Sequence, residues 1–177
     1  LVLAAAVYLF QELSLPFATP FLQDVAGLDL TRVGLLGSAS ALGGALLSPL
    51  LGWLADRAGR DRGLAACLFL LALSFATLMS AVGLEVLLLS ALLRGAGTVS
   101  WSLLAAMVAA ALPPQARGRG FALYSLAEGL AMAAGPYPGG WMYRANPYLP
   151  FATSTVLLFG VALILSISQK FHMTNPP

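Results

Sequence analysis

Residues 52–63 read GWLADRAGRDRG and gather five charged side chains, Asp56, Arg57, Arg60, Asp61 and Arg62, between two long apolar runs. The remainder of the chain carries little charge, since only 9% of its 177 residues are charged and 59% are hydrophobic. A soluble domain carries about a quarter charged residues, so this chain lacks the polar surface that faces water. The composition therefore predicts a membrane protein surrounded by lipid.

Six runs on either side of this charged stretch are long enough to cross a bilayer, for which about 20 mostly apolar residues are needed. They cover residues 1–22, 32–54, 64–82, 86–112, 121–143 and 150–168. Short polar segments separate the runs, so consecutive helices should be antiparallel neighbours with no soluble domain between them. The sequence predicts an all-α membrane protein: six transmembrane helices in a bundle over residues 1–169, followed by a cytoplasmic tail over residues 170–177.

The basic residues are divided unevenly between the two ends of the predicted helices. Two of them, Arg32 and Arg144, fall at one end. Six fall at the other, after the second, fourth and sixth runs: Arg57, Arg60, Arg62, Arg117, Arg119 and Lys170. Because basic loops stay in the cytoplasm, we expect a multi-pass protein of the cell membrane with both termini and the charged stretch on the cytoplasmic side.

The glycines and aspartates of the charged stretch need more than topology to explain them. Gly52 would allow a close helix approach, and Gly59 can take the positive φ of a turn. Asp56 lies at the membrane edge, where an ionised carboxylate is costly unless it meets an arginine or the positive end of a helix. The pattern resembles the loop signature of the major facilitator superfamily except at Asp61, where the family usually has a basic residue. The matching residues are Gly52, Leu54, Ala55, Asp56, Arg57, Gly59, Arg60 and Arg62.

This resemblance implies one six-helix half of a secondary transporter, built from two inverted three-helix repeats and facing a second half across the substrate site. In the family this loop bridges helices when the cytoplasmic side is shut, which implies a gating role for Asp56, Arg57 and Arg60. A loop that serves only as a topology anchor is the alternative. The polar ending and the absence of a starting Met favour the C-terminal half.

A second motif lies in the fifth run, where residues 135–140 read GPYPGG. It resembles the family's GPxxGG element, most often cited for exporters and antiporters, through Gly135, Pro136, Gly139 and Gly140. Pro136 and Pro138 remove two backbone donors and should kink the helix, so a plain packing kink is the alternative to an export motif. Small residues at four-residue spacing predict close helix packing, within this bundle or between two bundles: Ser40, Gly44 and Ser48, and Ala131, Gly135 and Gly139.

Four polar side chains, Gln11, Glu12, Arg94 and Glu128, fall inside the predicted spans and are the candidates for contact with a substrate or a proton. A charge at the bilayer centre costs about 2.5 kcal/mol or more, so such residues usually face a cavity or a partner. In the family the first and fourth helices of each bundle line the cavity, which implies that Glu12 and Arg94 contact the substrate or a proton. Exchange of a proton on the carboxylate against substrate or Arg94 would couple transport. A structural Glu12–Arg94 pair is the alternative.

Other classes of function find no support in the sequence. It has no nucleophile–base set, phosphate-binding glycine loop or HExxH spacing, and no basic patch interleaved with aromatic residues. We therefore expect no enzyme, no cofactor, no metal site and no nucleic-acid partner. The expected partners are the lipid bilayer, a small-molecule substrate, a proton or other coupling ion, and a second six-helix half. A non-transporting scaffold or regulatory half-protein and a self-associating half-transporter are the alternatives.

Overall fold

The computed structural model describes residues 1–80 and 83–174, with side chains up to Ile167, and the described residues form helices and short connections without strands. The elements in chain order are α1 (Val2–Glu12), the 3-10 helix η1 (Leu15–Phe17), α2 (Ala18–Asp24), α3 (Leu30–Ala58), α4 (Arg60–Ser80), α5 (Gly83–Arg94), α6 (Ala96–Ala111), the 3-10 helix η2 (Pro114–Ala116), α7 (Arg117–Ala134), α8 (Pro136–Ala145) and α9 (Leu149–Thr174). Most of the predicted tail thus continues α9, and residues 175–177 lie outside the described part.

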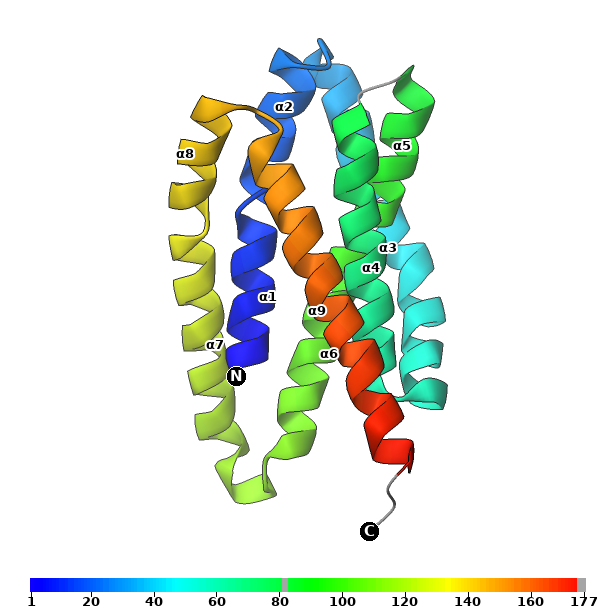
Figure 1. Ribbon diagram of the computed structural model, residues 1–177, viewed down its shortest axis with the longest axis vertical. Helices are drawn as coiled ribbons and strands as arrows, with labels where there is room; N and C mark the ends of the chain where they lie inside the picture. Colours follow the sequence, from blue (N-terminus) through cyan, green and yellow to red (C-terminus); the bar gives the residue numbers. More distant parts are fainter. Residues whose placement is uncertain (81–82, 175–177) are drawn as a thin grey trace.

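In the described part of the chain, five helical stretches are long and apolar enough to cross a membrane, and each matches a predicted run. They are Val2–Asp24, Leu30–Ala58, Arg60–Ser80, Gly83–Ala111 and Leu149–Ile167. The run predicted at 121–143 is divided between α7 and α8, and α7 carries Arg117, Arg119 and Glu128 within 18 residues. These two helices stand end to end beside α1 (Figure 1). The total of six spans and the repeat architecture stay predictions.

Three of the long helical stretches are interrupted. An α-helix joins each N–H to the carbonyl four residues earlier, and Pro16 has no N–H for the carbonyl of Glu12, where α1 ends. Pro136 starts α8 one residue after the end of α7, so the kink predicted at this motif is confirmed, although Pro138 lies inside α8. The third break, at Gly95 between α5 and α6, has no proline.

That third break lies where α3 meets α5 and α6 at backbone distance. A Cβ atom built on Gly95 would overlap the backbone of Gly43 and Gly44, and one on Gly43 would overlap the carbonyl of Leu92. Only glycines permit such an approach, which in a bilayer maximises packing between helices. The predicted small-residue row through Gly44 therefore packs inside this bundle.

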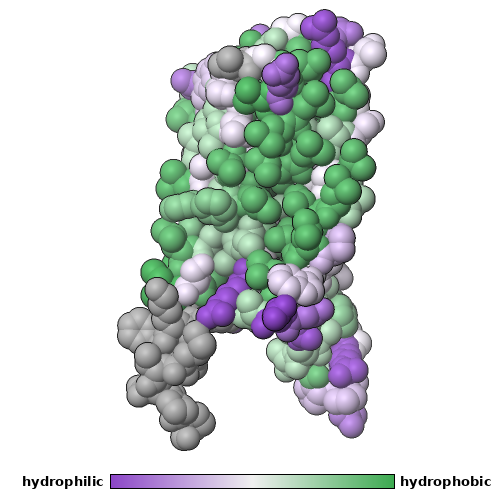
Figure 2. Space-filling model, turned by 90° about the vertical axis from the view of Figure 1, so that its right-hand side faces the viewer, coloured by the Kyte–Doolittle hydropathy of each residue, from purple (hydrophilic) through white to green (hydrophobic). Residues whose placement is uncertain are grey.

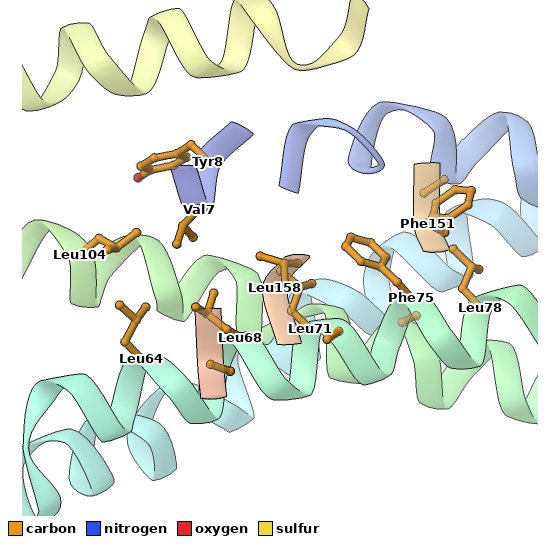
Figure 3. Packing of buried hydrophobic residues seen from close by; sticks show 14 of the residues in the cluster. Val7, Tyr8, Leu64, Leu68, Leu71, Phe75, Leu78, Leu104, Phe151 and Leu158 are labelled. Atoms are coloured by element: carbon orange, nitrogen blue, oxygen red, sulfur yellow. The ribbon is translucent and has the colours of Figure 1, made fainter. Parts of the chain in front are cut away.

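The core fills the space between α1, α4, α6 and α9. Figure 3 shows Val7 and Leu104 facing Leu68 and neighbouring leucines of α4, and the rings of Phe75 and Phe151 closing the other end. Buried serines also link the helices: Ser74 Oγ donates to the Ser90 carbonyl at 2.8 Å, with the reciprocal bond at the same distance. Interhelical hydrogen bonds in a membrane contribute about 0.6 kcal/mol each on average, so apolar packing carries most of the cohesion.

The face of the molecule seen in Figure 2 is apolar over its middle, with hydrophilic residues gathered at the two ends. The α3–α4 junction, the α6–α7 junction and the end of α9 lie at the same end (Figure 1). The apolar segment of α3 is 22% buried, against 56% for that of α4. Leu42, Leu46 and Leu50 of α3 are more than half exposed, so this helix offers an apolar face to lipid or to another bundle.

Candidate functional site

The break after α1 and the break between α7 and α8 lie against each other. A Cβ atom built on Gly135 would stand 2.6 Å from the Cβ of Glu12, and one on Gly139 would overlap the carbonyl oxygen of Leu13. The glycines of the GPxxGG element therefore bring two helix breaks into backbone contact. We call this contact, formed by Glu12, Leu13, Gly135, Pro136 and Gly139, the broken-helix joint.

Side chains on either side hold the joint together. The ring of Phe17 stacks on that of Tyr143 with centroids 5.4 Å apart, and Gly140 lies beside Phe17, where a Cβ would meet its ring at an ordinary 3.6 Å. Ser14 Oγ donates to the carbonyl of Pro150 at 2.8 Å. Because Ser14 lies in the break itself, this bond ties the interrupted backbone to α9.

Glu12 is the charged residue of the joint. Its side chain is 8% exposed, and in the part of the chain with described side chains it has neither a hydrogen bond nor an ion pair within 4.0 Å. An ionised carboxylate with little access to solvent is costly without a counter-charge or hydrogen-bond donors. The site therefore suits a group that takes up a proton or meets a cation supplied from outside this chain.

Gln11, predicted beside Glu12 as a substrate contact, is instead a buried link between α1 and α6. Its Nε2 donates to Ser100 Oγ at 3.1 Å, and its Oε1 accepts from Trp101 Nε1 at 2.8 Å. The side chain is 0% exposed. Both the nitrogen and the oxygen of its amide are thus hydrogen-bonded within the protein, and in this conformation the side chain is not accessible to a substrate.

A tyrosine pair joins α1 to α7 one turn before the joint, and sequence reasoning missed it. The hydroxyls of Tyr8 and Tyr124 are 2.8 Å apart, and both residues are buried. Glu128 lies near this pair and is partly exposed. The signal in the sequence was a repeated Tyr-x-x-x-Glu, at Tyr8–Glu12 and Tyr124–Glu128, which sets each tyrosine one helical turn from a carboxylate.

Arg94 does not meet Glu12. It ends α5, and its Nε donates to Ser40 Oγ on α3 at 3.4 Å. Among the side chains described, neither Arg94 nor Glu12 belongs to an ion pair. The alternative of a structural Glu12–Arg94 pair is therefore wrong for this conformation, because Arg94 is held against α3.

The charged stretch is a tight junction of two helices instead of a loop. Asp56 and Arg57 lie in the last turn of α3, and Gly59 is the single residue between the end of α3 and the start of α4. Gly59 has φ 99° and ψ 147°, which confirms the predicted positive φ. The close approach predicted at Gly52 is wrong within this chain, because a Cβ there would meet no atom within 4 Å. Gly63 makes that approach, against Ala55.

Two arginines of this junction make contacts in different directions. Arg60 Nη1 donates to the carbonyl of Ala106 on α6 at 3.4 Å, whereas the guanidinium of Arg57 lies 5.2 Å from the centre of the Trp53 ring within α3 itself. Asp56 is exposed, and no ion pair joins it to a residue whose side chain is described. Its gating role stays a prediction that needs a partner beyond these contacts.

Comparison with known proteins bears directly on this arrangement. The model of the Major Facilitator Superfamily matches residues 1–175. The chain belongs to the major facilitator superfamily. Its membership confirms the resemblance carried by the charged stretch and the GPxxGG element, and agrees with the apolar helices in showing an integral membrane protein of a transporter family.

Two curated proteins of known name are similar in sequence to this major facilitator chain. It is 29% identical to "Tetracycline resistance protein, class C" of Escherichia coli over 164 residues, covering 90% of this chain and 41% of that protein. It is 32% identical to "Quinolone resistance protein NorA" of Staphylococcus aureus over 176 residues, covering 96% of this chain and 44% of that protein. The chain therefore spans less than half the length of these relatives. These two relatives do not favour the alternative of a non-transporting scaffold or regulatory half-protein.

Proposed function

We propose that this chain is one half of a secondary active transporter that exports a small molecule in exchange for protons. Membership of the superfamily and the two resistance proteins among its relatives support the proposal. The single observation that carries the coupling is Glu12, a buried carboxylate without a counter-charge at the joint of two broken helices. A second six-helix bundle, from the same protein or from a second copy, would supply the opposite wall of the substrate site.

The proposed cycle follows from the surroundings of Glu12. When the carboxyl is neutral, it can stay in the apolar joint at little cost; when it is ionised, it requires a cation or water from the facing cavity. Substrate and proton then compete for one site, which is the condition for obligatory exchange. Each ligand stabilises the conformation that it binds better, so their exchange shifts the balance between the two orientations of the carrier.

The broken-helix joint would couple the exchange at Glu12 to movement of the helix backbones. Gly135 and Gly139 touch Glu12 and Leu13 without intervening side chains, so a rearrangement at Glu12 must displace α7 and α8 as well as α1. Arg94 and Glu128 are proposed to line the same cavity, with Arg94 held by Ser40 and Glu128 near the tyrosine pair. Gln11 would support the site indirectly, because its hydrogen bonds hold α1 against α6.

Asp56 is proposed to gate the cytoplasmic side. Its side chain is exposed at the end of α3, where it can reach the second bundle when that side closes, while Arg60 keeps the junction against α6. The orientation proposed for this protein has both termini and the charged junction in the cytoplasm, in the plasma membrane, as the distribution of arginines predicts.

The experiment that tests the coupling uses the full-length transporter in proteoliposomes. Glu12→Gln keeps the size and polarity of the side chain but cannot ionise, so it should abolish transport driven by a pH gradient. Glu85→Gln is the matched control, because Glu85 is exposed in the first turn of α5 and should leave transport unchanged. Unaltered pH-driven transport in Glu12→Gln would remove the assignment.

A further inference from the structure

A long trough runs along the outer surface between α4 and α9. Its wider part has a volume of about 310 Å³ and lies between Arg62 and Ala66 of α4 and Ala162 and Ser166 of α9. A second part of about 200 Å³ continues toward Ala76. Phe69 and Phe159 line both parts, and their ring centroids are 5.8 Å apart. The two parts therefore lie end to end along the surface of α4 and α9, with the contacting pair of aromatic rings between them, and together we call them the α4–α9 trough.

The trough is somewhat longer than the hydrocarbon core of one leaflet of a bilayer, so an acyl chain of that leaflet can lie along it. From Arg62 to Ala76 the helix advances 14 residues, or about 21 Å at 1.5 Å per residue. Half of a hydrocarbon core is about 15 Å thick. Beyond Arg62 and Ser166 the trough is lined by apolar side chains and one threonine, Thr155, whose hydroxyl donates to the carbonyl of Phe151. Its occupant must therefore be an extended apolar chain.

The charged end of the trough determines what kind of chain fits. Arg62 lines its mouth at the end where the other arginines of the charged stretch lie. Arg62 already interacts within the protein, but a guanidinium has five N–H donors and can hold a phosphate as well as another partner. The stretch as a whole has three arginines against two aspartates, a net charge of +1.

We propose that the α4–α9 trough binds an anionic phospholipid, with one acyl chain along α4 and α9 and the phosphate on Arg62. Basic pockets between transmembrane helices on one membrane side are suited to acidic headgroups, and here such a charge stands at the mouth of an apolar channel of acyl-chain length. This site lies outside the broken-helix joint. The proposal needs the membrane location of the chain but does not rest on proton-coupled export.

The test measures lipid bound to the purified, delipidated full-length protein by native mass spectrometry, without substrate or gradient. The probes are dioleoylphosphatidylglycerol and dioleoylphosphatidylcholine, which share acyl chains and differ in headgroup charge. Wild-type protein should bind the phosphatidylglycerol more tightly. Arg62→Gln should weaken that binding about fivefold, the effect of one basic residue near a charged membrane surface, and Ala66→Phe should weaken binding of both lipids by filling the trough.

Matched variants on α7 complete the design. Arg119→Gln removes an exposed arginine, and Ala122→Phe adds an aromatic ring at an exposed position a similar distance from its helix start; both should bind lipid as wild type does. Equal affinity for the two lipids, or an Arg62→Gln protein that binds like Arg119→Gln, would overturn the proposal. Should Ala66→Phe fail to fold, the comparison of the two arginine variants decides. Failure of the Glu12→Gln test would leave this result untouched.

Discussion

Replacing Gly135 with alanine should destabilise the protein, although alanine is ordinarily the better helix former. A Cβ at this position would stand 2.6 Å from the Cβ of Glu12 and 3.1 Å from its carbonyl carbon. Ordinary contacts begin at 3.4 Å, so α1 and α7 must separate here by about 0.8 Å, from 2.6 to 3.4 Å. No rotamer change relieves the overlap, because each Cβ is fixed to its backbone.

The expected magnitude is the difference between two opposing effects. Overpacking a close contact costs about 1–3 kcal/mol, and replacing a helical glycine with alanine returns about 0.5–1 kcal/mol. Gly135→Ala should therefore lose about 1 kcal/mol of unfolding free energy at the centre of these ranges, and at most about 2.5 kcal/mol. Gly129→Ala is the matched control, because Gly129 lies in the same helix and its Cβ would meet no atom within 4 Å. That variant should gain up to about 1 kcal/mol.

The assay is denaturant unfolding of the purified full-length protein in detergent micelles, followed by tryptophan fluorescence, with both variants measured beside wild type. The prediction depends on the order of the three midpoints: Gly129→Ala highest, wild type next and Gly135→Ala lowest. If Gly135→Ala unfolds at the midpoint of Gly129→Ala, the two helix breaks are not in backbone contact and the broken-helix joint does not exist in the folded protein.

Two further changes probe other close contacts, with unfolding free energy as the measurement. Gly59→Ala should cost about 1–3 kcal/mol, because φ 99° with ψ 147° is a conformation that essentially only glycine adopts. Gly52→Ala, inside α3 and in open space, should instead gain up to about 1 kcal/mol; equal effects would contradict the tight junction. Tyr8→Phe should cost about 1–3 kcal/mol, because it leaves the buried hydroxyl of Tyr124 without its partner. The double variant Tyr8→Phe/Tyr124→Phe should lose less than the sum of the single losses, and strict additivity would rule out the hydroxyl pair.

Much of the helical architecture could be predicted from the apolar runs and the prolines. Pro16 and Pro136 act locally, through a missing N–H, so the breaks they cause are visible in the sequence. The break at Gly95 was not visible, because it coincides with the approach of the α3 backbone at Gly43 and Gly44, a contact between residues about 50 positions apart. The charged stretch was expected to be a loop, but arginine, alanine and leucine are good helix formers, so Gly59 alone interrupts it.

Of the residues predicted for the candidate site, Glu12 agrees with the reasoning from sequence and Gln11 does not. Glu12 was identified by the cost of its charge, and its place at the joint agrees with that reasoning. Gln11 was grouped with it as a sequence neighbour, but successive residues on a helix point about 100° apart, so Gln11 faces α6 while Glu12 faces α7. Its partners Ser100 and Trp101 lie about 90 residues away, and no local pattern indicates that pairing.

The position of the joint follows from a requirement of the bilayer. A broken helix leaves backbone groups without helical partners, and in lipid such groups must be covered by protein or line a polar cavity. Here the break of α1 covers the break between α7 and α8, and Gly135 and Gly139 make the contact close enough to exclude lipid. A carboxylate is less costly beside such backbone groups than in lipid, and Glu12 lies at the level of α1 where they are gathered. Fold and proposed coupling thus require the same glycines, and a change that relaxes the contact should weaken both.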